Sequence, residues 1–149
     1  NTIFHRSIKD YVIQAGRFKT PVVSNGVPIA IPTTSSVRNE PLNSNIMKTI
    51  SMAKLAGQPD SATSQFFFNL IDNSNPLDSD GGGHTVFGNV IQNWEIVRLL
   101  GLELTYNATN FYNGLALADL PFYFDTIPSD GIVKPSDFLQ IKKVTIVQE

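Results

Sequence analysis

The 149-residue chain contains no cysteine, which excludes disulfides, thiolate metal sites and cysteine nucleophiles. Histidine is scarce: the only two, His5 and His84, do not form an HExxH metal-binding pattern. The sequence therefore gives no reason to expect a metal or another cofactor. The absence of cysteine favours a periplasmic or secreted location over the cytoplasm, although cytoplasmic proteins can also lack cysteine.

Charged residues and long apolar runs are also few. Charged residues make up 16% of the chain, the formal net charge is -2, and neither sign forms a long run. Because nucleic-acid-binding proteins carry a clustered basic face, no nucleic-acid partner is expected. No stretch approaches the ~18 apolar residues of a membrane span. The length and the 42% hydrophobic content predict one globular domain, residues 1–149, and nothing indicates a stable oligomer.

Short apolar runs separated by turn-forming residues predict a mainly β protein. One helix is expected at 93–101, with Asn93 as its N-cap, Gly101 at its end, and Trp94, Val97 and Leu100 on one face. Without βαβ alternation, the pattern favours an antiparallel sandwich or barrel with a loop-rich segment late in the chain. The expected strands are 2–6, 11–16, 48–54, 64–71, 84–91 and 139–148, and the loop-rich segment is 102–138.

Strand alternation also predicts where some side chains point. Phe66, Phe67 and Phe68 are consecutive, so Phe67 should face the opposite side of a sheet from its two neighbours. By the same rule the side chain of His5 should point away from that of Arg6, which favours a structural role for this histidine.

Several short motifs do not match the functional patterns that they partly resemble. Asp78-Ser79-Asp80-Gly81 is similar to part of a calcium loop, but the first and twelfth ligand positions would be Pro76 and Phe87. The three glycines at 81–83 precede a strand rather than a helix, so they do not predict a phosphate site. Ser64 lacks the GxSxG context of a hydrolase nucleophile.

Three segments in order carry a family resemblance: "FHRSIKDYVIQAGRF" (4–18), "ISMAKLAGQPDSATSQFFFNL" (50–70) and "LDSDGGGHTVFGNV" (77–90). Together they resemble the cyclophilin family of peptidyl-prolyl cis-trans isomerases, and the middle segment is especially similar to bacterial members. The resemblance is strong as far as about residue 101, after which only the closing strand matches. It implies a closed eight-stranded antiparallel β-barrel with capping helices and a shallow groove on its outside.

The resemblance implies a role for each motif residue. Arg6 matches the catalytic arginine of the Phe-His-Arg motif, and Gln14 matches the glutamine that braces it. An apolar groove with an arginine and no nucleophile suits rotation about Xaa-Pro bonds, in which no bond is broken. The expected partners are proline-containing peptides and unfolded client proteins whose folding is assisted. The substrate-binding residues implied are Tyr11, Val12, Phe67 and Leu77 in the proline pocket, Ala53 and Lys54 along the peptide backbone, Gln65 in the groove and His84 on its rim.

Two departures from the family pattern stand out. Pro76 precedes Leu77 where the family often has Trp or Phe, and Trp94 lies too far along the chain to replace it, so cyclosporin is expected to bind weakly. The family also has a strand, a helix and usually another strand before the Phe-His-Arg segment. None of these precedes the segment here, and a barrel built from this chain alone would have a gap with unpaired edges, so we expect this portion to be missing from the chain or supplied by another chain. The start at Asn1 without Met also indicates a processed, trimmed or incompletely represented N-terminus.

Other interpretations remain open at this level. The same fold could hold proline-containing peptides without turnover, and the aromatic residues late in the chain allow a sugar-binding β-sandwich, which leaves the three segments unexplained. Single residues have simpler explanations too: a strand cation paired with a carboxylate for Arg6, a solvated edge charge for Lys54, ordinary strand amides for Gln14 and Gln65, and a turn-exit residue for His84.

Overall fold

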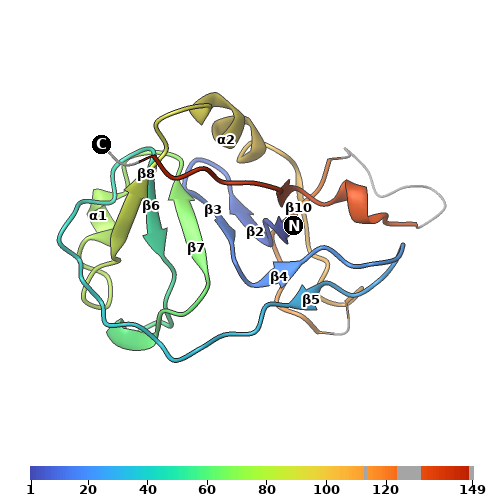
Figure 1. The fold of residues 1–149 in the computed structure, drawn as a ribbon, viewed down its shortest axis with the longest axis horizontal. Coiled ribbons are helices and arrows are strands. Elements are labelled where there is room, and N and C mark those ends of the chain that lie inside the picture. The colour runs from blue at the N-terminus through green and yellow to red at the C-terminus, as the bar shows by residue number, and fades with distance from the viewer. Residues whose placement is uncertain (113, 124–131, 148–149) are drawn as a thin grey trace.

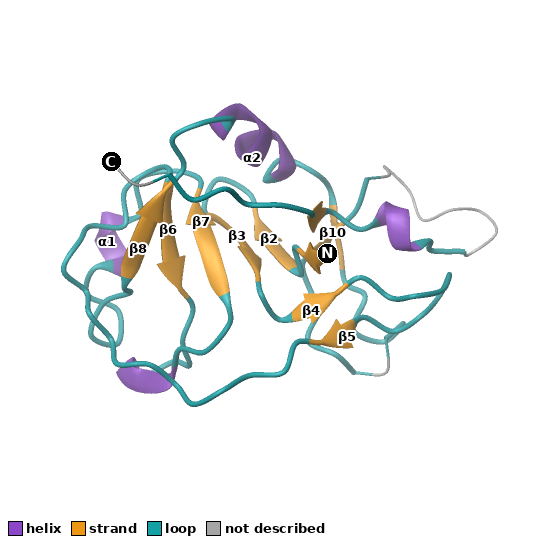
Figure 2. Cartoon of the chain, in the orientation of Figure 1, coloured by secondary structure: helices purple, strands orange, loops and turns teal. Residues whose placement is uncertain are grey.

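The computed structural model describes residues 1–112, 114–123 and 132–147 as a β-rich fold with short strands and two α-helices (Figures 1 and 2). The mainly β prediction is confirmed. The strands are β1 (Thr2–Ile3), β2 (Arg6–Ile8), β3 (Val12–Ala15), β4 (Phe18–Lys19), β5 (Ile29–Ala30), β6 (Thr49–Met52), β7 (Phe66–Asn69), β8 (Val86–Asn89), β9 (Thr105–Tyr106), β10 (Leu120–Pro121) and β11 (Gln140–Ile141). The helices are α1 (Ser74–Leu77) and α2 (Trp94–Leu100), with short 3-10 turns η1 (Pro59–Ser61) and η2 (Pro135–Asp137).

The strands form antiparallel sheets, and the N-terminal segment joins the two larger ones. The largest has the order β2-β3-β7-β6-β8, a second has the order β11-β1-β4-β5, and β9 pairs with β10. The chain passes from β1 to β2 through Phe4 and His5, whose amides donate to Leu139 O (2.9 Å) and Gln14 O (3.0 Å). This segment therefore joins the two larger sheets, as the run of strands through the middle of Figure 1 illustrates.

The β2–β3 hairpin presents Arg6 directly beside Gln14. Asp10 adopts a left-handed φ of 54° in the turn, and the amide of Tyr11 donates to Ile8 O at 3.1 Å. The resulting register pairs Arg6 with Gln14. The outer edge of β2 is covered by the chain near residue 119, where Ser7 N donates to Asp119 O at 2.8 Å.

The hydrophobic side chains gather in two main cores. One lies around Ile3, Phe18, Tyr112 and Phe138, and includes much of the late loop-rich segment. The other joins the sheet to α2, where buried Trp94 and half-buried Val97 and Leu100 pack with Phe68. The helix face predicted from the sequence is thus confirmed, and α2 lies against one end of the large sheet (Figure 1).

Asn93 occupies the N-cap position of this helix, as expected, but its side chain does not cap the helix. Asn93 has a left-handed φ of 59°, and its side chain makes no capping hydrogen bond. A capping residue needs an extended conformation so that its side chain reaches the first amides of the helix, and the left-handed conformation does not provide this. The exposed side chains of Glu95 and Arg98 instead pair within the helix at 2.8 Å.

The closing strand is shorter than predicted. β11 ends at Ile141 because its neighbour β1 has only two residues, Thr2 and Ile3, with which to pair. Residues 142–147 are exposed and form no strand, so that part of the prediction is wrong; residue 148 lies outside the described residues. Among the described residues no sheet closes on itself. None of their helices has the length and apolar character needed to span a membrane.

Candidate active site

A groove of about 470 Å³ on one side of the large sheet brings together distant parts of the chain. All ten site residues expected from the sequence line it, as do six others. The expected ones are Arg6, Tyr11, Val12, Gln14, Ala53, Lys54, Gln65, Phe67, Leu77 and His84. The others are His5, Arg17, Asp80, Ala116, Ala118 and Asp119.

One part of the groove is an apolar pocket separate from the two cores. Val12, Phe67 and Leu77 are buried against one another, with Tyr11 and Ala53 packed beside them. Phe66 and Phe68 instead pack in the core with α2, so the predicted alternation is confirmed. A shape of this kind, lined by aliphatic and aromatic side chains, can bury a small apolar ring.

Arg6 stands at the polar side of this pocket. Its side chain is 45% exposed, and its Nε lies 3.5 Å from Asp119 Oδ2, so the guanidinium keeps donors free for a ligand. Asp119 was not expected from the sequence, because it lies in the loop-rich segment and no local motif surrounds it. The carboxylate holds the arginine near the groove as an ion pair exposed to solvent.

Gln14 is held by another glutamine. Its Nε2 donates to Gln65 Oε1 at 3.0 Å, which joins β3 to the residue preceding β7. Among the described residues no hydrogen bond joins the side chains of Gln14 and Arg6, although the two residues face each other in the ladder. The bracing role of Gln14 stays a prediction.

His84 is a neutral ring on the opposite rim. Its Nδ1 lies 3.0 Å from Met52 O, and because a carbonyl only accepts, Nδ1 carries the hydrogen. Burial lowers the pKa of His84, with Lys54 acting in the same direction, although the bond to Met52 and nearby Asp80 oppose this. The ring stacks edge-on against Phe67 with centroids 5.4 Å apart, which fixes one wall of the pocket.

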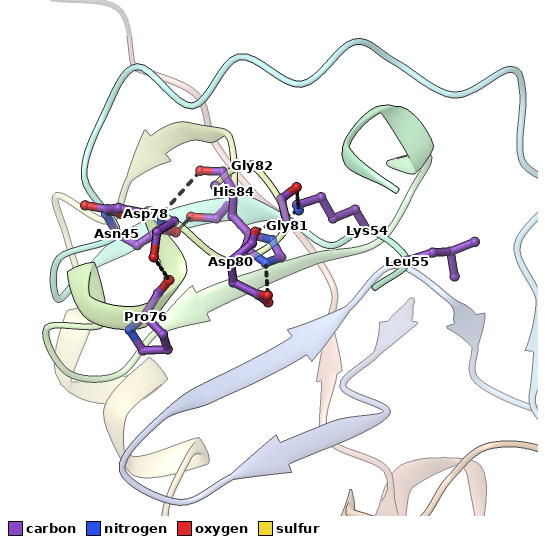
Figure 3. A network of polar contacts seen from close by, with 12 residues as sticks. Asn45, Lys54, Leu55, Pro76, Asp78, Asp80, Gly81, Gly82 and His84 are labelled. Carbon is purple, nitrogen blue, oxygen red and sulfur yellow. Dashed lines mark hydrogen bonds and ion pairs between the residues drawn. The ribbon is translucent and has the colours of Figure 1, made fainter. Parts of the chain in front are cut away.

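Residues 78–83, here called the rim loop, are held in place by two side chains. Lys54 Nζ donates to Asp80 O (3.0 Å) and Gly81 O (2.8 Å), as Figure 3 shows. From the other side, Asn39 Nδ2 lies 2.9 Å from the carbonyl oxygens of both Gly82 and Gly83. Lys54 is therefore more than a solvated edge charge, since its ammonium joins the end of β6 to the rim loop.

Asp78 anchors the base of the rim loop. Its Oδ1 accepts from the backbone amide and the side-chain amide of Asn45 at 2.8 and 2.9 Å, and its Oδ2 accepts from Ser44. These bonds explain why the motif around Asp78 is structural. Within the described ranges, no group of three or more His, Asp or Glu side chains could hold a metal ion.

A buried chain of amides and hydroxyls continues from Asn45 beneath the pocket. Ser51 Oγ donates to Asn45 Oδ1 at 2.7 Å, and Asn69 Nδ2 donates to Thr49 Oγ1 at 2.7 Å. Asn73 completes the chain, because its Nδ2 lies 2.9 Å from both Asn69 Oδ1 and Tyr11 O. The backbone of Tyr11 is thereby tied to β7 and to the residue before α1.

Fold and groove together define a β-rich domain with an arginine beside an apolar pocket. The family model described as "Cyclophilin type peptidyl-prolyl cis-trans isomerase/CLD" matches residues 1–114. The chain belongs to this cyclophilin-type family. The match covers the strands and loops that supply most of the groove, and it ends before Asp119.

Curated bacterial proteins are similar over much of the chain. A peptidyl-prolyl cis-trans isomerase of Acinetobacter baylyi is 40% identical over 100 residues, which cover 64% of this chain and 49% of that protein. Peptidyl-prolyl cis-trans isomerase A of Dickeya dadantii is 36% identical over 75% of this chain and 57% of its own length. Peptidyl-prolyl cis-trans isomerase B of Escherichia coli is 34% identical over 65% of this chain and 58% of its own length. The chain thus spans about half the length of these relatives.

Proposed function

We propose that this chain catalyses cis-trans isomerisation of Xaa-Pro peptide bonds in proline-containing peptides and unfolded client proteins, and so assists their folding. The observation that carries the proposal is the position of the Arg6 guanidinium beside the pocket of Val12, Phe67 and Leu77. Family membership and the names of the relatives support the same reaction.

The reaction requires that a twisted amide be bound better than a planar one. Amide resonance gives the bond a rotational barrier of about 18–20 kcal/mol, and rotation through roughly a quarter turn breaks this conjugation. The prolyl nitrogen then has a lone pair that can accept a hydrogen bond, which the planar amide lacks. A donor directed at this nitrogen lowers the barrier, because it stabilises the transition state more than the ground state.

The groove residues suit this chemistry. Arg6 keeps its charge and offers several donors in one plane, and Asp119 restrains it near the groove. Tyr11, Phe67 and Leu77 would hold the proline ring while the residue before it rotates. The neighbouring apolar groups lower the local dielectric, which strengthens the hydrogen bond from Arg6. The reaction needs no cofactor, since no bond forms or breaks.

Replacing Arg6 by Ala tests the proposal. We expect the isomerisation rate of a short Xaa-Pro peptide, measured as kcat/KM, to fall by about tenfold or more. Arg98→Ala is the matched control, because Arg98 is also half exposed and paired with a carboxylate but lies on α2 outside the groove. Equal rates for wild type and Arg6→Ala would contradict the catalytic role proposed for Arg6. Peptide binding without acceleration would indicate the non-catalytic binding module instead.

The finer features expected from the family are also proposals. A closed eight-stranded barrel would need a further strand, from a longer form of the polypeptide or from another chain, to cover the open edge at β8 and the exposed segment 142–147. Weak cyclosporin binding is proposed because Pro76 stands where an aromatic residue is common in the family. Action as a monomer, and a periplasmic or secreted location, stay predictions.

A further inference from the structure

Arg17 is a second arginine of the groove to which the proposed reaction gives no role. It follows β3 and lines the same groove as Arg6, with its side chain partly buried. The two groove carboxylates lie elsewhere: Asp119 is 3.5 Å from Arg6, and Asp80 is 3.9 Å from His84. No hydrogen bond or ion pair involves the Arg17 guanidinium within the part of the chain that the structure describes. Arg17 therefore brings an uncompensated positive charge to the groove.

The backbone fixes where this side chain begins. A Cβ on Gly16 would lie 2.2 Å from Ser64 O, so only glycine allows the chain to turn so closely past this residue. Ser64 Oγ also donates to Gly16 O at 2.8 Å, and Arg17 O accepts from Ile31 N at 2.9 Å. Arg17 is thus held between two strands at the groove, and its position does not depend on a flexible loop.

The side chain itself is also restrained. The Arg17 Cζ atom lies 5.1 Å from the centroid of the Phe18 ring, a distance at which the aromatic face attracts the cation. The ring supplies no hydrogen-bond acceptor for the several N–H donors of the guanidinium. In addition, Arg17 contributes more than Arg6 to the lowered pKa of buried His5, so its charge acts within the groove.

We propose that Arg17 is a specificity-determining residue that binds an anionic side chain, Asp or Glu, close to the proline of the peptide. This inference rests on the proposed function, because it concerns the substrate of the same groove. A carboxylate can accept two parallel hydrogen bonds from a guanidinium, so it supplies what Arg17 lacks among the described residues. Since the charge is present in the ground state and the transition state alike, the preference belongs in KM rather than in kcat.

The test compares peptides that differ only in Glu against Gln. The substitution is placed in turn at the two positions before the proline and at the two positions after it. For each peptide, kcat/KM is measured at low and high salt. For wild type we expect kcat/KM of the Glu peptide to exceed that of the Gln peptide by a factor of about five at one position or more; this factor is the Glu/Gln ratio. The difference should come from KM and should decrease at high salt. Arg17→Gln should bring the ratio to about one, and Arg17→Lys should keep part of it, because Lys retains the charge without the planar donors.

Lys19→Gln is the matched control. This substitution removes the same charge two residues after Arg17. Because Lys19 is exposed on β4 and does not line the groove, the Glu/Gln ratio should stay at its wild-type value. A wild-type ratio of one at every position would overturn the inference. So would equal losses of the ratio in Arg17→Gln and Lys19→Gln, which would indicate only overall charge.

The two proposals fail in different ways. If neutral peptides are accelerated without any Glu/Gln preference, the isomerase proposal stands and the Arg17 inference falls. If no peptide is accelerated, the isomerase proposal falls, and the dissociation constants of the same peptides, measured by titration, decide the inference about Arg17. Tighter binding of a Glu peptide that disappears in Arg17→Gln supports it, and equal binding overturns it.

Discussion

Among single residues, His5 shows how strongly position controls the chemistry of a side chain. Only 3% of its surface is exposed, and its ring packs edge-on against Phe18 with centroids 5.8 Å apart. Burial, together with Arg17, lowers the pKa of His5 from 6.5 to about 4, although the hydrogen bond that the ring donates to Gln65 opposes this. The ring is neutral at pH 7. Protonating it would place three cations close together, namely His5, Arg6 and Arg17.

Replacing His5 by Gln should flatten the pH dependence of stability. The unfolded chain takes up this proton near pH 6.5, whereas the folded chain does so only at about 4. The contribution of His5 to stability is therefore complete above pH 6.5 and is lost progressively as the pH falls toward 4. We expect wild type to lose roughly 2 kcal/mol from this source between neutral pH and pH 5.

Denaturant unfolding of both proteins across this pH range checks the prediction, with Lys19→Gln as a control that changes an exposed residue of β4. The measured quantity is the difference in unfolding free energy between wild type and His5→Gln. Parallel pH curves for the two proteins would show that His5 titrates normally in the folded state.

At the scale of elements, the rim loop depends on residues far from it in sequence. Lys54 comes from the end of β6, Asn39 from the long segment before it, and Asp78 is held by Asn45. Because these side chains fix the loop that joins α1 to β8, they also fix Leu77 and His84 at its two ends. The wall of the apolar pocket is thus built by contacts that the loop sequence alone does not contain.

The rim loop should be less tolerant of Gly83→Ala than of a comparable change nearby. Gly83 has a φ of +76°, and a Cβ there would lie 2.8 Å from both Asp78 O and Pro41 Cβ. We expect a loss of about 2–4 kcal/mol, from the left-handed conformation and from crowding. The free energy of unfolding and the peptide KM should both change.

Gly57→Ala is the control for this experiment. Gly57 has a similar φ of +72°, but nothing lies within 4 Å of an added Cβ. Its substitution should cost only the backbone term, about 1 kcal/mol. Equal losses for the two variants would mean that the rim loop moves aside without cost and does not hold the pocket wall.

At the scale of the whole molecule, the described fold leaves strand edges open. β8 is an edge strand whose Phe87 is 55% exposed, and Val144 and Ile146 are 66% and 86% exposed on the segment after β11. Natural proteins usually cover or charge such edges, because unpaired strands with apolar side chains associate with one another.

Substituting both Val144 and Ile146 by Lys should reduce self-association of this chain without lowering its stability. The two side chains are exposed, so no packing is lost, while added charge opposes pairing of the segment with another copy. Light scattering against protein concentration measures the effect. The control is the double variant Val22→Lys, Leu42→Lys, which places the same charges at exposed apolar residues away from the segment after β11. Equal effects of the two double variants would speak against an open edge, and also against the barrel closure proposed above.

The local sequence alone determined much of this protein. Strand alternation predicts that Phe67 and its two neighbours lie on opposite faces of the sheet. Helical spacing predicts which face of the helix carries Trp94. Both predictions depend only on the geometry of neighbouring residues. The three segments identified the family and ten residues that share one groove. The hairpin that sets Arg6 beside Gln14 could also be predicted, since its turn is local.

Only the tertiary structure decided the rest. It brought Asp119 to Arg6 from 113 positions later in the chain, directed Lys54 toward the rim loop, and left Arg17 without an anionic partner among the described residues. It also ended β11 at Ile141, because the length of a strand depends on the neighbour it pairs with. Contacts of this kind join residues with no local pattern in common, so periodicity and turn signals cannot predict them.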